Sequence, residues 1–152
     1  MKLYLDNCCY NRPYDDQTQE KIHMEGEAVL AIINRCIKNI DEIVGSPALD
    51  LEIAQIGDSE KKEKVKYLYE QVITTKVDYT ENVLKQAREL SEQTSIRTLD
   101  GFHLAFAENS GADFLLTTDI KFEKLCSKLN MKTRVVNPLK YLMEVMLNEH
   151  NA

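Results

Sequence analysis

The chain has 152 residues, the length of one ordinary domain and enough to bury a hydrophobic core. Hydrophobic residues make up 43% and charged residues 29% of the sequence, a balance that excludes a disordered chain. The formal net charge of −6 argues against a protein that coats nucleic acid through a basic surface. It leaves nucleic-acid chemistry open, because an enzyme that holds divalent cations needs carboxylates.

The first residues and the cysteines bear on where the protein resides. The opening MKLYLD is charged too early, and its apolar run is too short, for a signal peptide. No stretch of the sequence approaches the length of a transmembrane helix. The cysteines form no C-x-x-C pair, which disfavours a disulfide framework and a zinc site. We therefore expect a cytoplasmic protein without a membrane segment.

The predicted elements alternate between short apolar strands and helices. In chain order we expect a strand at 2–6, a loop at 11–16, a helix at about 18–38, a strand at 42–45, helices at 47–56 and 58–72, a strand at 76–79, helices at 81–93 and 99–110, a strand at 113–117, a helix at 121–129, a strand at 133–136 and a helix from 138 onward. Ser46, Thr80 and Thr98 are predicted N-caps, and Gly57 a helix stop. This alternation predicts one α/β domain over 1–152, with a parallel sheet between two helical layers (α/β/α).

Two predicted strands run into an aspartate. Asp6 ends the first strand, and Asp119 follows the fourth. Ligands of open parallel sheets bind beyond the carboxyl ends of the strands, so both acids lie at the edge where a site is expected. Each also has a structural explanation: Asp6 as a turn-forming aspartate and Asp119 as a helix cap.

Two further acids stand in apolar surroundings. Glu52 falls within the apolar arc of the helix at 47–56, where a lone carboxylate is costly unless it is paired or binds a metal. Asp100 opens a helix that is apolar almost all round. The structural alternative for Glu52 is that it is solvated at the rim of the apolar arc, and that for Asp100 is favourable charge at a helix N-terminus.

Taken together, the acids Asp6, Glu52, Asp100 and Asp119 are predicted to meet at one edge of the sheet. Clustered carboxylates repel one another, and divalent cation binding is the simplest reason for tolerating them. Hard oxygen ligands suit Mg²⁺ or Mn²⁺, and such ions most often serve phosphoryl chemistry.

The segments that carry these acids, LYLDNC, GSPALDLEIA and RTLDGFHLAFAENSGADFLLTTD, resemble the PIN domain family, the nuclease fold of many bacterial toxin–antitoxin toxins. The resemblance covers nearly the whole chain and assigns Asp6, Glu52, Asp100 and Asp119 as the site acids, with Thr117 as the site threonine. It implies metal-dependent endoribonuclease activity, a parallel five-stranded sheet, a homodimer and a small antitoxin partner. Gly101 stands where an alanine is common, and Asn7-Cys8 replaces the usual small hydroxyl residues, but neither departure removes an acid.

The resulting hypothesis is hydrolysis of RNA phosphodiester bonds, with the four acids holding one or two Mg²⁺ or Mn²⁺ ions directly or through water. Asn7 and Thr117 are candidates to orient an acid or a water, or make ordinary hydrogen bonds at a strand end. Arg12, Arg97 and Lys121 are candidates to grip RNA phosphates, or are ion-paired surface residues.

Other functions and other residues remain open from the sequence alone. His103, one turn after Asp100, either hydrogen-bonds a ligand carboxylate or is a satisfied core histidine. For Cys8 and Cys9, packing as small hydrophobic side chains is favoured over redox control. A non-catalytic PIN-like module that binds RNA or a protein is the alternative function. A receiver or phosphatase-like fold is disfavoured, because no second aspartate follows Asp6 at the D-x-D spacing.

Overall fold

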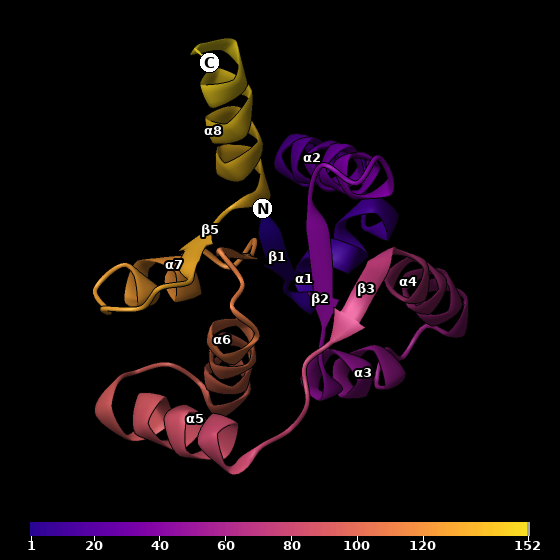
Figure 1. The fold of residues 1–152 in the computed structure, drawn as a ribbon. Helices are drawn as coiled ribbons and strands as arrows, with labels where there is room; N and C mark the ends of the chain where they lie inside the picture. Colours follow the sequence, from indigo (N-terminus) through magenta and orange to yellow (C-terminus); the bar gives the residue numbers. More distant parts are fainter. Residues whose placement is uncertain (152) are drawn as a thin grey trace.

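The structure is a computed structural model that describes residues 1–151 and, among side chains, those of residues 1–149. Its strands form one parallel sheet in the order β3-β2-β1-β4-β5, flanked by helices (Figure 1). The strands are β1 Lys2–Leu5, β2 Glu42–Gly45, β3 Ile73–Lys76, β4 Phe114–Leu116 and β5 Arg134–Val136. The helices are α1 Asn7–Asn11, the 3-10 turn η1 Arg12–Tyr14, α2 Glu20–Ile37, α3 Pro47–Ala54, α4 Ser59–Val72, α5 Glu81–Gln93, α6 Thr98–Ser110, α7 Ile120–Cys126 and α8 Pro138–Asn151. The predicted fold class, with its five-stranded parallel sheet, is confirmed.

Strand β1 lies at the centre of the sheet and determines where its carboxyl edge falls. It pairs with β2 on one side and with β4 on the other, in a register that sets Leu5 opposite Leu116. The ladder continues one residue further, because the Asp6 N–H donates to the Leu116 carbonyl at 2.9 Å. The residues that follow β1 and β4 therefore emerge side by side.

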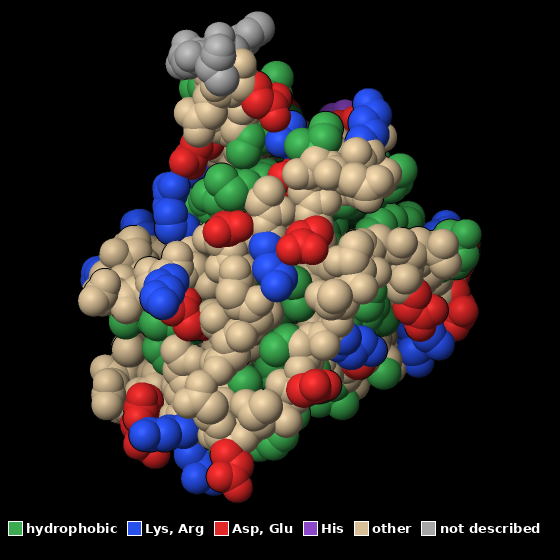
Figure 2. Space-filling view, in the orientation of Figure 1, with side chains coloured by type: hydrophobic (Ala, Val, Ile, Leu, Met, Phe, Trp, Pro, Cys, Tyr) green, Lys and Arg blue, Asp and Glu red, His purple; other side chains and the backbone are tan. Residues whose placement is uncertain are grey.

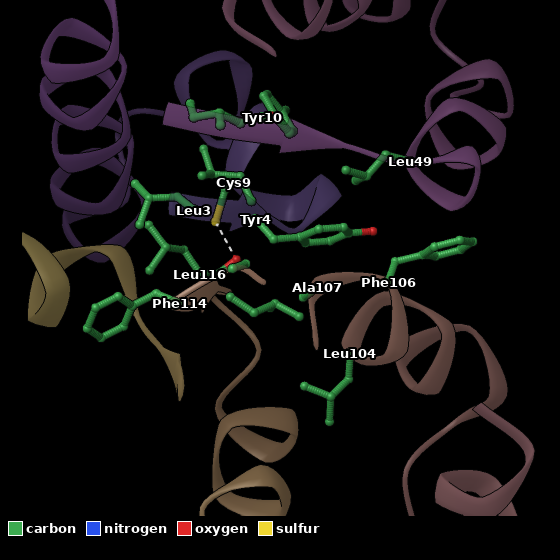
Figure 3. Packing of buried hydrophobic residues seen from close by; sticks show 14 of the residues in the cluster. Leu3, Tyr4, Cys9, Tyr10, Leu49, Leu104, Phe106, Ala107, Phe114 and Leu116 are labelled. Atoms are coloured by element: carbon green, nitrogen blue, oxygen red, sulfur yellow. Dashed lines mark hydrogen bonds between the residues drawn. The ribbon is translucent and has the colours of Figure 1, made fainter. Parts of the chain in front are cut away.

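The core is built on both faces of β1, where the side chains of Leu3, Tyr4 and Leu5 are fully buried (Figure 3). The Cys9 thiol donates to the Leu116 carbonyl at 3.2 Å, so this cysteine packs against β4. The Tyr4 ring extends between Leu49 of α3 and Phe106 of α6 in Figure 3. Tyr4 thus carries a polar hydroxyl toward the two helices that hold Glu52 and Asp100.

Strand β3, helix α1 and the cap of α6 differ from the predictions. Strand β3 occupies 73–76 rather than 76–79, since the β-branched Ile73, Thr74 and Thr75 favour a strand directly after α4. Helix α1 was not predicted, because the sequence NCCYN has no apolar periodicity. Thr98 is the first residue of α6 and Arg97 is its cap, without a capping hydrogen bond from the side chain.

The other predicted helix starts are confirmed. The Ser46 hydroxyl accepts from the Leu49 N–H at 3.1 Å, and Thr80 caps α5 in the same way. Helix α3 ends at Ala54, before the predicted stop at Gly57.

A buried carboxylate ties helices α2 and α8 to the start of β2. Asp41 accepts from Arg35 Nε at 2.9 Å and from the Tyr141 hydroxyl at 2.8 Å. Burial alone would raise the pKa of Asp41, but these hydrogen bonds lower it below the usual value.

Across the part of the chain that the structure describes, no helix combines the length and apolarity needed to span a membrane.

Candidate active site

Asp6 is the most enclosed of the predicted acids. It directly follows β1, caps α1 and is 7% exposed. Its Oδ1 accepts from the Asn7 backbone N–H at 2.8 Å, and its Oδ2 accepts from the Thr117 hydroxyl at 2.9 Å. The Cys8 thiol lies 3.5 Å from the same Oδ2. Donors from both neighbouring strand ends therefore fix the direction of this carboxylate.

Glu52 reaches the same place from α3. The β2 strand ends at Gly45, Ser46 caps α3, and Glu52 follows one and a half turns later on the side that faces α6. Its Oε1 accepts from His103 Nε2, and its side chain keeps 22% exposure. The glutamate in the apolar arc is thus paired with a histidine, and not solvated alone at the rim.

His103 belongs to both of the predicted classes. It is fully buried, and both of its ring nitrogens are hydrogen-bonded. Nδ1 lies 2.7 Å from the Tyr4 hydroxyl, and Nε2 contacts Glu52 and lies 3.8 Å from Asp6 Oδ1. Burial alone would lower the pKa of His103, but the hydrogen bond to Glu52 and the negative charge of Asp6 raise it above the usual value.

Asp100 and Asp119 lie on the other side of the site and share one cation. Arg97 Nε donates to Asp100 Oδ2 at 3.3 Å, and its Nη2 lies 3.5 Å from Asp119 Oδ2. The arginine side chain is 79% exposed, whereas Asp100 keeps only 15% exposure. Burial and the charge of Asp6 raise the pKa of Asp100, against the attraction of Arg97.

Asp119 has a second contact that is purely structural. Its Oδ1 accepts from the Phe122 N–H at 3.1 Å and so caps α7, as the helix-cap interpretation predicted. Its own backbone N–H donates to the Thr117 hydroxyl at 3.1 Å. Since the same hydroxyl donates to Asp6, Thr117 is the link between the two aspartates at the strand ends.

The four acids are brought to one edge of the sheet in two groups. Asp6, Glu52 and His103 each offer a ligand atom, and these atoms lie within 4.8 Å of one another. Asp100 and Asp119 are joined through Arg97, and Asp100 lies close enough for the charge of Asp6 to act on it. Mixed carboxylate and imidazole donors at this spacing are consistent with a divalent metal site.

A pocket of about 200 Å³ adjoins the second group. Its lining residues are Ser95, Ile96, Arg97, Asp100, Asp119, Lys121, Phe122 and Leu125. Two of these are cations, Arg97 and Lys121. On the face drawn in Figure 2, basic and acidic side chains are interspersed, with no single basic field. The pocket itself therefore offers two positive charges to an anionic ligand.

The remaining predicted residues divide between the site and the scaffold. The Asn7 backbone contacts Asp6, but its side-chain carbonyl accepts from Asn11 Nδ2 at 2.9 Å. Arg12 is paired with Asp15 and the buried Glu25, both at 3.0 Å, as a scaffold residue would be.

Two residues at the site were not predicted. Tyr4 and Ser46 are fully buried, and their hydroxyls lie 2.6 Å apart behind His103. One signal for Tyr4 was available in the sequence, because a tyrosine in a buried strand needs a partner for its hydroxyl. Nothing in the spacing of positions 4, 46 and 103 indicates that they meet.

Comparison with known proteins gives a family and a structural neighbour. The sequence profile described as the PIN domain matches residues 22–128. A solved structure described as VapBC2 from Rickettsia felis bound to a DNA fragment from their promoter contains a chain with the same fold, at 14% identity and a TM-score of 0.57. The match covers 89% of the present chain and 98% of that one. No curated protein matches the sequence.

Proposed function

We propose that this chain, which belongs to the PIN domain family, is a metal-dependent endoribonuclease that hydrolyses RNA phosphodiester bonds. The observation that carries the proposal is the meeting of Asp6 and Glu52 within 4.8 Å at the carboxyl edge of a parallel sheet, with Asp100 and Asp119 alongside. Carboxylates from four separate elements converge there, although each is costly to hold near the others.

The donor set fits a hard divalent cation. Asp6, Glu52, Asp100 and Asp119 would hold Mg²⁺ or Mn²⁺ directly or through water, since both ions favour carboxylate oxygens. When bound, such an ion supplies an activated water and relieves charge on the attacked phosphate and the leaving oxygen. The donors around Asp6 leave its carboxylate fixed before any ion arrives, which reduces the ordering needed on binding.

The pocket beside Asp100 suits the phosphate backbone of the substrate. Arg97 is highly exposed, so its guanidinium is free to turn from Asp100 toward a phosphate oxygen with little loss of packing. Lys121 lines the same pocket as a second cation. Their expected role is to hold the strand while Asp6 and Glu52 face the scissile bond.

The protein is further proposed to be the toxin of a toxin–antitoxin pair and a homodimer. Support comes from the family resemblance of the three acid-bearing segments and from the shared fold with a chain of the VapBC2 assembly. Expression of the chain alone should arrest growth, and co-expression of a small protein encoded beside it should relieve the arrest. A solution mass equal to one chain would reject the homodimer.

The decisive experiment incubates purified protein with defined single-stranded and structured RNAs, and with DNA of the same sequences. Cleavage of RNA is expected with Mn²⁺ or Mg²⁺, none with chelator, and none from Asp6→Asn or Asp100→Asn. Asp78→Asn, which neutralises an exposed loop carboxylate, is the matched control and should cut like the parent. Cleavage by Asp6→Asn at the parent rate would refute the assignment, and a parent that binds RNA but never cuts it would support the non-catalytic module.

A further inference from the structure

A chain of buried hydrogen bonds runs from the cap of α3 to the Glu52 carboxylate. The Leu49 N–H donates to the Ser46 hydroxyl at 3.1 Å, which lies 2.6 Å from the Tyr4 hydroxyl. The Tyr4 hydroxyl lies 2.7 Å from His103 Nδ1, and His103 Nε2 contacts Glu52. Ser46, Tyr4 and His103 are all fully buried, so each polar group depends on the next for its partner.

Donor and acceptor counting gives this chain one direction when the imidazole is neutral. Ser46 accepts from the backbone and donates to Tyr4, and Tyr4 donates to His103 Nδ1. The ring proton then lies on Nε2 and points to Glu52. In the doubly protonated ring the Ser46–Tyr4 and Tyr4–His103 hydrogen bonds reverse, whereas the Leu49 N–H still donates to Ser46 and the Nε2–H of His103 still faces the carboxylate. Burial raises the pKa of Tyr4, which keeps its hydroxyl protonated.

We propose that His103, oriented by Tyr4 and Ser46, is a positioning residue that holds the Glu52 carboxylate beside Asp6. The inference rests on the proposed function, since it assigns Glu52 a place in a metal site. Glu52 lies on an eight-residue helix and keeps partial exposure, so its side chain would otherwise sample several rotamers. The same nitrogen, His103 Nε2, lies 3.8 Å from Asp6 Oδ1, and its N–H lessens the repulsion between the two carboxylates.

The competing role for His103 is direct metal ligation through Nε2. That role requires a lone pair on Nε2, and the proton then has to move to Nδ1, where it would face Tyr4. The two roles therefore predict opposite tautomers of His103 and different effects of the substitution His103→Gln on metal binding. A glutamine amide can place an N–H close to the position of Nε2, so His103→Gln should preserve positioning but abolish nitrogen ligation.

The test measures binding of Mn²⁺ alone, by titration and thermal shift, in four proteins. Tyr4→Phe should weaken Mn²⁺ binding by about 10-fold, the lower end of the effect of losing a hydrogen-bond partner of a metal ligand, because Tyr4 acts on Glu52 through His103. His103→Gln should stay within a few-fold of the parent. Tyr10→Phe is the matched control, because Tyr10 is equally buried and its hydroxyl has no hydrogen-bond partner among the described residues. Equal affinities of Tyr4→Phe and Tyr10→Phe would overturn the proposal.

Two spectroscopic measurements separate positioning from ligation and from failure of the proposed function. In metal-free protein, ¹⁵N NMR should show His103, identified by its loss in His103→Gln, with the proton on Nε2. An Nδ1–H tautomer would overturn the proposal even if the enzyme cleaves RNA. Electron spin-echo spectra of the Mn²⁺-loaded parent and of Mn²⁺-loaded His103→Gln should show the same nitrogen couplings. A coupling that is present in the parent and lost in His103→Gln would indicate that His103 ligates the ion. A parent that binds no Mn²⁺ would reject the proposed function and, with it, this role for His103, whereas binding without cleavage would reject only the nuclease.

Discussion

Replacing Asp100 with asparagine is expected to stabilise the metal-free protein at neutral pH. Burial and the charge of Asp6 raise the pKa of Asp100 in spite of Arg97, so folding disfavours the charged carboxylate. The substitution removes that charge and keeps the shape of the side chain. After a discount for solvent screening at this partly exposed site, the expected gain is about 0.5–1 kcal/mol. For a chain of this length that corresponds to roughly 1–4 °C in Tm.

The direction of the pH dependence follows from the raised pKa. The parent loses stability as the pH rises from the unfolded value, about 3.9, through the higher folded value, because the native state has to release a proton it prefers to keep. The variant carries no such group. Its advantage over the parent should be complete at pH 7 and absent below about pH 4.

The assay is urea unfolding of parent, Asp100→Asn and the exposed control Asp78→Asn, in chelator, at pH 7 and at pH 4. Saturating Mn²⁺ should invert the order at pH 7, since the parent gains about 2.7 kcal/mol at a hundredfold excess over Kd and the variant gains less. Lower stability of Asp100→Asn in chelator at pH 7, or a difference from the parent that is the same at both pH values, would refute the reasoning.

Three further changes test the rest of the fold and the site. Asp119→Asn should keep the α7 cap and lose Mn²⁺ stabilisation, whereas Asp119→Ala should lose both and cost about 1 kcal/mol in chelator; calorimetry with and without metal separates them. Gly45→Ala would place a Cβ 2.5 Å from the Tyr69 hydroxyl and should destabilise by about 1–3 kcal/mol in urea, while Gly57→Ala, with no heavy atom within 4 Å, should be neutral. Asp41→Asn should destabilise by about 1–3 kcal/mol at pH 7, and because the pKa of Asp41 is lowered, its deficit should shrink as the pH falls below about 3.9.

The sheet and its helices were predictable because their signals are local. Apolar runs locate four of the five strands, and Ser46 and Thr80 mark helix starts. Strand β3 was misplaced because Val77 and Tyr79 resemble a strand as much as the β-branched run just before them. Helix α1 depends on Asp6 as its cap and on packing of Tyr10, which no periodicity in five residues reveals.

The site was predictable to the extent that topology alone determines it. Asp6 and Asp119 follow parallel strands, so the fold class implies that they share an edge. The partners of the acids were not predictable, because they are long-range contacts: Glu52 with His103 spans 51 positions and Tyr4 with His103 spans 99. A single sequence carries no record of such pairs.

The two groups of acids differ in what balances their charge, and this difference determines how the site can respond to a ligand. The donor beside Asp6 and Glu52 is a fully buried imidazole, held from behind by Tyr4, so moving it would leave buried polar groups without partners. The cation beside Asp100 is an exposed guanidinium whose contacts are worth little and are easily exchanged with water. When a cation or phosphate binds, the His103–Glu52 pair therefore keeps its position. The rearrangement that binding requires is made by the exposed Arg97 side chain.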